Sequence, residues 1–198
     1  MTSILRDHGL GTRPHLEWNP ECVIRKSLCL HAGDDERSGQ TVGSMVSELR
    51  NAESIHWVTA TASPCLSIFK PLLIDVQVPL DVRPTDRFDS RALWWRHERL
   101  HRAAVMDDFG RVLEDIRPER DALEAGFRAR MAGLSSGAST SDRQRAVTDC
   151  WREAMEMEDR WLARTTRILD RGTTRHHEVW SNLNRIAAMS DDPKGGRI

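Results

Sequence analysis

The sequence predicts an α+β fold, in which an antiparallel sheet of about four strands packs on long C-terminal helices. Two observations carry this prediction. Residues 22–77 contain short runs in which bulky apolar and small polar side chains alternate, the period expected of strands. Residues 89–189 instead repeat apolar side chains at the spacing of amphipathic helices. At 198 residues the chain is long enough to bury a core of its own, so a single domain is expected.

Four strands are expected in the first half of the chain. Residues 33–39 contain two glycines and four charged side chains, which is typical of an exposed hairpin loop. Pro71 has no N–H to donate to a neighbouring strand, so the last strand should bend there or run along an edge of the sheet. Short connections join antiparallel neighbours. The expected strands lie near residues 22–31, 40–49, 54–61 and 65–77.

A long helix is expected next, because Asp89 or Ser90 can cap its N-terminus. Apolar side chains then recur at helical spacing as far as Val112. Pro118 should break or kink this helix, since proline has no N–H for the helical hydrogen bond. The helical pattern resumes over residues 119–131.

A second long helix is expected from Ser141 to about Leu169, after a linker of small residues. Trp151 and Trp161 lie on one side of this helix. Large aromatic side chains at helical spacing usually pack, so both are expected in the core. The single domain over residues 1–198 therefore comprises a strand-rich part, a helical part that ends in a short helix, and a tail expected to be disordered, at 1–88, 89–189 and 190–198.

Charge and cysteine content narrow the class of protein. The net charge of −1 provides no attraction to nucleic acid or to an anionic membrane, so neither partner is expected. The four cysteines form no C-x-x-C pair, and the sequence has no signal peptide and no apolar run of membrane length. These features predict a cytoplasmic protein with reduced thiols, in which Cys29 and Cys65 are buried small apolar side chains.

Four sequence segments carry a family resemblance: SLCLHAG, QTVGSMVSEL, HWVTATASPCLSIFKP and LWWRHERLHR. In this order they resemble the C-terminal half of the secernin and cysteine-dipeptidase family of N-terminal-nucleophile hydrolases, over about Ile4 to Leu134. The resemblance implies that the sheet and helices form half of a four-layer αββα sandwich. It also implies that the family's nucleophile, a cysteine at the mature N-terminus, lies in an N-terminal half that this chain does not contain.

The resemblance implies a function as the C-terminal portion of a dipeptidase-like cysteine amide hydrolase, inactive alone. The complete enzyme would act on a peptide or amide substrate without a cofactor, and the partner would be a missing N-terminal half or a second copy of the chain. The polar face of the sheet would then line the substrate pocket. Alternatively, these polar residues only satisfy one another's hydrogen bonds. The pocket candidates are His31, Gln40, Thr41, Ser44, Thr59 and Thr61.

Two other functions stay open. One is a non-enzymatic binding or complementation subunit. The other is a zinc hydrolase, since His97, Glu98 and His101 satisfy the H-E-x-x-H pattern, which places two imidazoles one helical turn apart. Against zinc, three arginines surround the pattern, and His97 falls on the apolar side of the helix, where a packed histidine is expected. We therefore expect no metal site.

Overall fold

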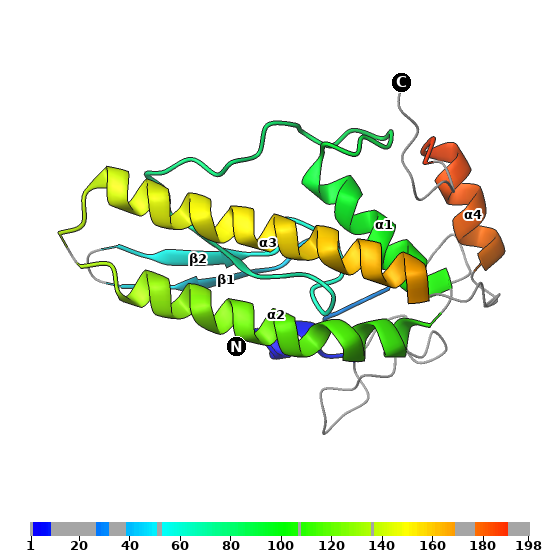
Figure 1. The fold of residues 1–198 in the computed structure, drawn as a ribbon, viewed down its shortest axis with the longest axis horizontal. Coiled ribbons are helices and arrows are strands. Elements are labelled where there is room, and N and C mark those ends of the chain that lie inside the picture. Colours follow the sequence, from blue (N-terminus) through cyan, green and yellow to red (C-terminus); the bar gives the residue numbers. More distant parts are fainter. Residues whose placement is uncertain are drawn as a thin grey trace.

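The computed structural model describes residues 2–8, 27–31, 39–50, 53–106, 108–135, 137–168 and 177–189. A short 3₁₀ helix and a three-stranded sheet come first, and four α-helices follow (Figure 1). The α+β prediction is thus confirmed, with the helices toward the C-terminus. In chain order the elements are η1 (Ile4–Arg6), β1 (Met45–Glu48), β2 (Ile55–Val58), β3 (Lys70–Leu72), α1 (Leu93–Met106), α2 (Phe109–Ala132), α3 (Thr140–Ile168) and α4 (His177–Ile186).

The sheet is an antiparallel meander in the order β1-β2-β3. Trp57 of β2 pairs with Val46 on one side and with Pro71 on the other. Pro71 therefore lies on an edge strand, as expected from its missing N–H. Of the four expected strands, the first has no counterpart within residues 27–31, and its earlier part, 22–26, lies outside the described residues.

The last strand is much shorter than expected because a loop occupies residues 59–69 before it and a second turn follows it at residues 74–76. Ala60 and Ser63 adopt left-handed backbone conformations, with φ of 55° and 52°, and such residues cannot continue an extended strand. The carbonyl of Ser63 then accepts hydrogen bonds from the amides of Leu66 and Ser67, which closes a tight turn. Alternation of side chains alone does not reveal this turn.

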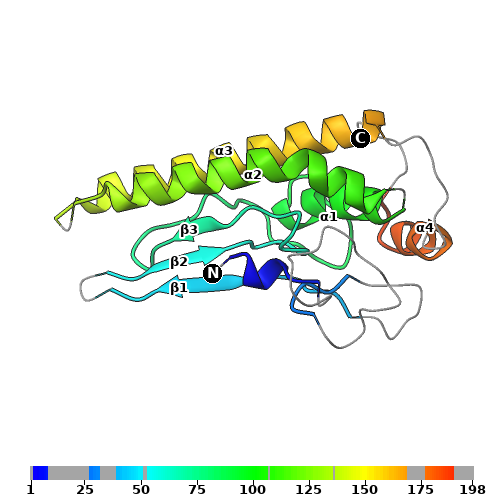
Figure 2. The same cartoon turned by 90° about the horizontal axis from the view of Figure 1, so that it is seen from below.

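The sheet meets the helices through β3. Trp151 of α3 donates its indole N–H to the carbonyl of Pro71 at 2.7 Å, and Glu124 of α2 accepts the amide of Phe69 at 2.8 Å. β1 lies at the other edge, away from α2 and α3 (Figure 2). There Met45 and Leu49 keep 60% and 80% of their surfaces exposed. The helices therefore cover the β3 side of the sheet and leave the β1 edge open.

α1 ends at Met106 and α2 begins at Phe109, so of the break or kink expected at Pro118, the break is wrong. The carboxylate of Asp108 accepts the amide of Arg111 at 3.0 Å and so caps α2. Pro118 lies inside α2. It is exposed, as is Glu114 one turn earlier, whose carbonyl loses its helical partner and can bond water instead.

The core lies where α1, α2, α3 and β3 meet. Trp151 and Trp161 are fully buried there, which confirms the prediction for both. The N-terminus of α3 is capped by Ser139, whose hydroxyl accepts the amide of Asp142 at 3.1 Å, so the cap lies two residues before the expected Ser141. The expected disordered tail at 190–198 lies outside the described residues. None of the described helices is both long enough and apolar enough to cross a membrane.

Candidate metal centre

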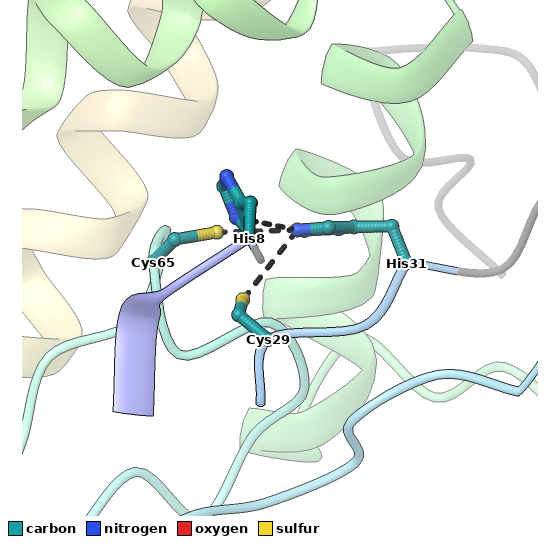
Figure 3. A group of neighbouring side chains, drawn as sticks. All are labelled: His8, Cys29, His31 and Cys65. Carbon is teal, nitrogen blue, oxygen red and sulfur yellow. Dashed lines mark hydrogen bonds between the residues drawn. The ribbon is translucent and has the colours of Figure 1, made fainter. Parts of the chain in front are cut away.

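Four side chains that are distant in the sequence meet in the interior of the protein: His8, Cys29, His31 and Cys65 (Figure 3). One imidazole nitrogen or thiol sulfur from each lies within 4.8 Å of the other three. Each of the four residues is at most 2% exposed. Two imidazoles and two thiols in such a cluster form the donor set of a Cys₂His₂ metal centre.

Three separate segments supply these side chains. His8 follows η1, and the carbonyl of Asp7 accepts the amide of Cys29 at 3.0 Å, which holds the first segment against the second. Cys29 and His31 come from residues 27–31, which form no strand and bend at positions 28 and 29, and both side chains are buried, whereas Leu28 is exposed. Cys65 comes from the loop between β2 and β3. The centre thus joins three parts of the chain that share no helix or strand.

The loop that carries Cys65 is tied to its surroundings by hydrogen bonds. The amide of Ser63 donates to the carbonyl of Thr41 at 2.9 Å, and the hydroxyl of Thr59 donates to the carbonyl of Thr61 at 2.9 Å. Ser63 also places its hydroxyl 3.4 Å from His31 Nδ1. Left-handed residues such as Ser63 persist only where the surrounding structure holds them. The strained turn therefore positions Cys65 beside His31.

The distances around His31 match those of a tetrahedral metal site. Its Nε2 atom lies 3.2 Å from His8 Nε2, 3.5 Å from Cys29 Sγ and 3.4 Å from Cys65 Sγ. In a tetrahedral zinc site with Zn–N bonds of about 2.05 Å and Zn–S bonds of about 2.3 Å, neighbouring ligand atoms are separated by about 3.3 Å for two nitrogens and about 3.5 Å for nitrogen and sulfur. The three separations from His31 Nε2 therefore suit an ion of that size, and the four donor atoms as a set lie within 4.8 Å of one another.

A second layer of polar side chains orients His31. Its Nδ1 atom lies 3.1 Å from His101 Nε2, and His101 Nδ1 lies 3.3 Å from a carboxylate oxygen of Glu98. If Nδ1 of His31 carries the proton, it can donate to His101 Nε2, and His31 Nε2 keeps its lone pair for a metal; His101 Nδ1 has Glu98 nearby but forms no well-aligned hydrogen bond with it. Such outer partners fix the tautomer of a metal-binding histidine. Glu98 is itself held by Arg102 at 2.9 Å and by Gln40 at 3.0 Å.

The protonation states of His31 and Cys65 suit metal binding, whereas Cys29 would have to give up its proton when the ion binds. Burial lowers the pKa of His31 to about 4, against the opposing effect of the Cys65 sulfur, so the imidazole is neutral at pH 7. Burial raises the pKa of Cys29 well above that of a free thiol, and Cys65 adds to this effect. For Cys65, burial acts in the same direction but is outweighed by the hydrogen bond from Cys29 and by His31, so its pKa is lowered. A thiolate and a neutral imidazole are the forms that bind metals.

The residues predicted to line a substrate pocket lie in several places around this centre. His31 is a member of the centre, and Gln40 contacts it through Glu98. The Thr41 hydroxyl accepts the amide of Leu30 and donates to the carbonyl of Leu28, while the Thr59 hydroxyl accepts the amide of Ser44. Thr59 and Thr61 are fully buried. These contacts join neighbouring parts of the chain to one another.

The two histidines of the H-E-x-x-H pattern face different neighbours. Nε2 of His97 lies 3.2 Å from the hydroxyl of Ser67, and its Nδ1 lies 3.6 Å from the carboxylate of Glu158. His101 instead contacts His31. Within the described part of the chain, the metal-compatible group is His8, Cys29, His31 and Cys65, and it contains neither of them.

Sequence reasoning did not find the centre as a whole. Cys29 and His31 were expected on one face of a strand, but His8 precedes them by 21 positions and Cys65 follows them by 34, and neither interval is a known metal-ligand spacing. The local signal was the C-x-H pair, which places a thiol and an imidazole side by side on extended chain. Cys65 was expected to be buried, as it is, but its partner is only visible in three dimensions.

The chain was compared with protein-family models, with curated proteins and with solved structures, and none of the three comparisons gave a match.

Proposed function

We propose that this protein binds one transition-metal ion, zinc being the best suited, through His8, Cys29, His31 and Cys65. The observation that carries the proposal is the convergence of four buried donor atoms within 4.8 Å, at separations around His31 Nε2 that suit a tetrahedral ion. Mixed sulfur and nitrogen donors in tetrahedral arrangement favour zinc over magnesium or calcium, which prefer oxygen.

The role that we propose for the ion is structural. Catalytic zinc sites keep one coordination position open to water or substrate, whereas structural sites use four protein ligands. Here four protein donors are available and all four residues are buried. The ion would hold residues 2–8, residues 27–31 and the loop between β2 and β3 together. Because the unfolded chain does not preform such a site, metal binding would contribute directly to folding stability.

Metal analysis of the purified, dialysed protein tests this proposal. We expect about one equivalent of zinc per chain, its loss in Cys65→Ser, and a fall in melting temperature when a chelator removes it. Cobalt(II) in place of zinc should show thiolate charge-transfer absorption that Cys65→Ser weakens. Cys150→Ser is the matched control, because Cys150 is also a buried cysteine but lies in α3, outside the centre.

A variant of the H-E-x-x-H pattern separates the two metal assignments. His97→Gln should retain zinc, because His97 contacts Ser67 and Glu158 and is not a member of the centre. Protein that contains no metal after expression in zinc-supplemented medium would contradict the proposal. Zinc that stays in Cys65→Ser but is lost in His97→Gln would assign the ion to the H-E-x-x-H pattern.

A second proposal concerns ancestry and partners. The segments that resemble the secernin and cysteine-dipeptidase family suggest the C-terminal portion of a dipeptidase-like amide hydrolase, in whose sandwich a second sheet would pack on the face of this one. The metal centre would then support the fold and take no part in amide hydrolysis. A complementation subunit without activity of its own is the alternative.

A panel of dipeptides, assayed with and without iodoacetamide, tests the second proposal. No strand of the described sheet begins with a cysteine nucleophile, so we expect no turnover by these 198 residues alone. Turnover that iodoacetamide abolishes would show that the chain carries a nucleophile of its own. Zinc content is measured on the same samples, so that the turnover result can be judged separately from the state of the metal centre.

A further inference from the structure

A pocket of about 380 Å³ lies between the N-terminal segment and α2, with Cys65 in its wall. Its lining has an excess of positive charge. Four arginines contribute to it against two carboxylates, which gives a formal balance of +2. The arginines are Arg6, Arg117, Arg120 and Arg128, and the carboxylates are Asp121 and Glu124.

Arg6 is largely used by the fold. It donates to both carboxylate oxygens of Glu124 and to the carbonyls of Pro64 and Ser67. Four of the five N–H groups of its guanidinium are thereby occupied. Arg6 and Glu124 therefore compensate each other in the pocket wall, and the surplus charge comes from the other arginines.

Arg120 is more buried than Arg6 but has donors left. Its Nε and Nη2 atoms both donate to Asp121, at 2.9 and 2.7 Å, and its Nη1 atom donates to the carbonyl of Cys65. Hydrogen bonds to described residues thus occupy three of its five N–H groups, and one N–H remains on each terminal nitrogen. Burial, and then the charge of Arg6, lower the pKa of Arg120, which means that additional negative charge nearby would be favourable.

Two further arginines lie at the exposed side of the pocket. Arg128 is half exposed, and its guanidinium lies 3.9 Å from the carboxylate of Glu124. The negative charge of Glu124 is already compensated by Arg6. Arg117 is exposed and forms no ion pair with any residue that the structure describes. Both side chains extend from α2, eleven positions apart, about three turns of the helix. They can approach a ligand from the solvent side while Arg120 contacts it from the protein side.

We propose that this pocket binds the oxyanion group, carboxylate or phosphate, of a small molecule. Arginine suits this role because its planar fork matches two oxygens of such a group. The volume is in the range of small-molecule sites, roughly 300 to 1,000 Å³, and Leu113 adds an apolar surface for the body of the ligand. The proposal does not require a bound metal, since the arginines that would contact the ligand are not members of the centre, although Cys65 lies in the wall that the two sites share.

Titration calorimetry with inorganic phosphate and with succinate, at constant ionic strength set by chloride, tests the proposal. We expect saturable binding of one equivalent of at least one of them, and the tighter of the two identifies the class of ligand. The double variant Arg117→Gln/Arg128→Gln removes the two exposed charges and should weaken binding by about tenfold or more. Arg111→Gln is the matched control: Arg111 is an exposed arginine of the same helix that does not line the pocket.

A further variant tests the buried guanidinium of Arg120. Arg120→Lys keeps the charge but loses the planar donor pair, so it should weaken binding while the circular dichroism spectrum stays unchanged. If that variant fails to fold, the double variant still decides, because its side chains are exposed. The proposal is overturned if neither anion saturates below about 10 mM, a weak limit for a specific site, or if Arg111→Gln weakens binding as much as the double variant does. Zinc content, measured in parallel, shows whether the centre is intact in each variant.

Discussion

Nδ1 of His31 lies 3.1 Å from Nε2 of His101, and this contact links the candidate metal centre to helix α1. Beyond His101 the chain of polar contacts continues to Glu98 and Arg102. The centre is therefore held by the helix that carries the H-E-x-x-H pattern, although neither histidine of that pattern belongs to it.

Replacing His101 should weaken zinc binding without removing a ligand. In His101→Ala the imidazole of His31 loses the acceptor that fixes its tautomer and orientation, and loss of such a partner typically costs about 10- to 100-fold in metal affinity. Competition with a chromogenic chelator measures the change. The control is His56→Ala, because His56 lies in β2 and contacts Ser47. Equal loss of affinity in both variants would count against the link between His31 and His101.

Stability should fall in acid because of Glu98. Burial by itself would raise the pKa of this carboxyl group, but His101 and then Arg102 outweigh it and lower the pKa to about 2, against 4.5 for a free side chain. The folded chain therefore favours the carboxylate. Its contribution is complete above pH 4.5 and is lost as the pH falls toward 2, by about 3 kcal/mol in all.

Urea unfolding at a series of pH values measures this contribution. In Glu98→Gln the free energy of unfolding should be lower at pH 6, and it should change less between pH 5 and pH 2 than in the unaltered protein. Glu156→Gln, which removes an exposed carboxylate of α3, is the control and should leave the profile unchanged. A Glu98→Gln profile parallel to that of the unaltered protein would show that Glu98 does not carry the acid sensitivity.

The buried ion pair of Arg6 and Glu124 should show strong coupling. It joins residues 118 positions apart, and Glu124 also accepts the amide of Phe69. Removing one partner leaves an uncompensated buried charge, which costs about 3 to 5 kcal/mol, whereas replacing both by apolar side chains of similar size is often close to neutral. We expect Glu124→Met to be much less stable than the double variant Arg6→Met/Glu124→Met. Urea midpoints of the four proteins give the coupling energy, and additive single effects would contradict the prediction.

Self-association is expected through the open edge of the sheet. Among the described residues β1 pairs with a strand on one side alone, and Met45 in it and Leu49 just after it are exposed apolar side chains, a combination that favours pairing with another strand. Sedimentation velocity at low micromolar concentration should show a species larger than the 22.6 kDa monomer. Met45→Lys/Leu49→Lys should shift it to the monomer, while Ile74→Lys, at an exposed position outside the sheet, should not. A compact monomer for the unaltered chain would refute this expectation.

Sequence periodicity anticipated much of the secondary structure. Alternating side chains located β1 and β2, because one side of a strand is buried and the other is not. Helical spacing located α1, α2 and α3, and the buried Trp151 and Trp161. The helix boundaries were predicted wrongly where another interaction outweighed the local sequence rule. Asp108 caps the start of α2, whereas Pro118 on the exposed side of α2 is tolerated.

The same distinction between local sequence pattern and tertiary contact applies to the candidate metal centre. By itself the sequence determined that Cys29 and His31 share a face, that Cys65 is buried, and that His97 and His101 lie one turn apart, because each statement depends only on neighbours within a few positions. Only the tertiary structure decided that His8 and Cys65 meet Cys29 and His31, while His97 faces Ser67. The physical reason is that such meetings depend on the path of loops, here on the left-handed turn at Ser63 and on the hydrogen bond between Asp7 and Cys29. Periodicity carries no information about that path.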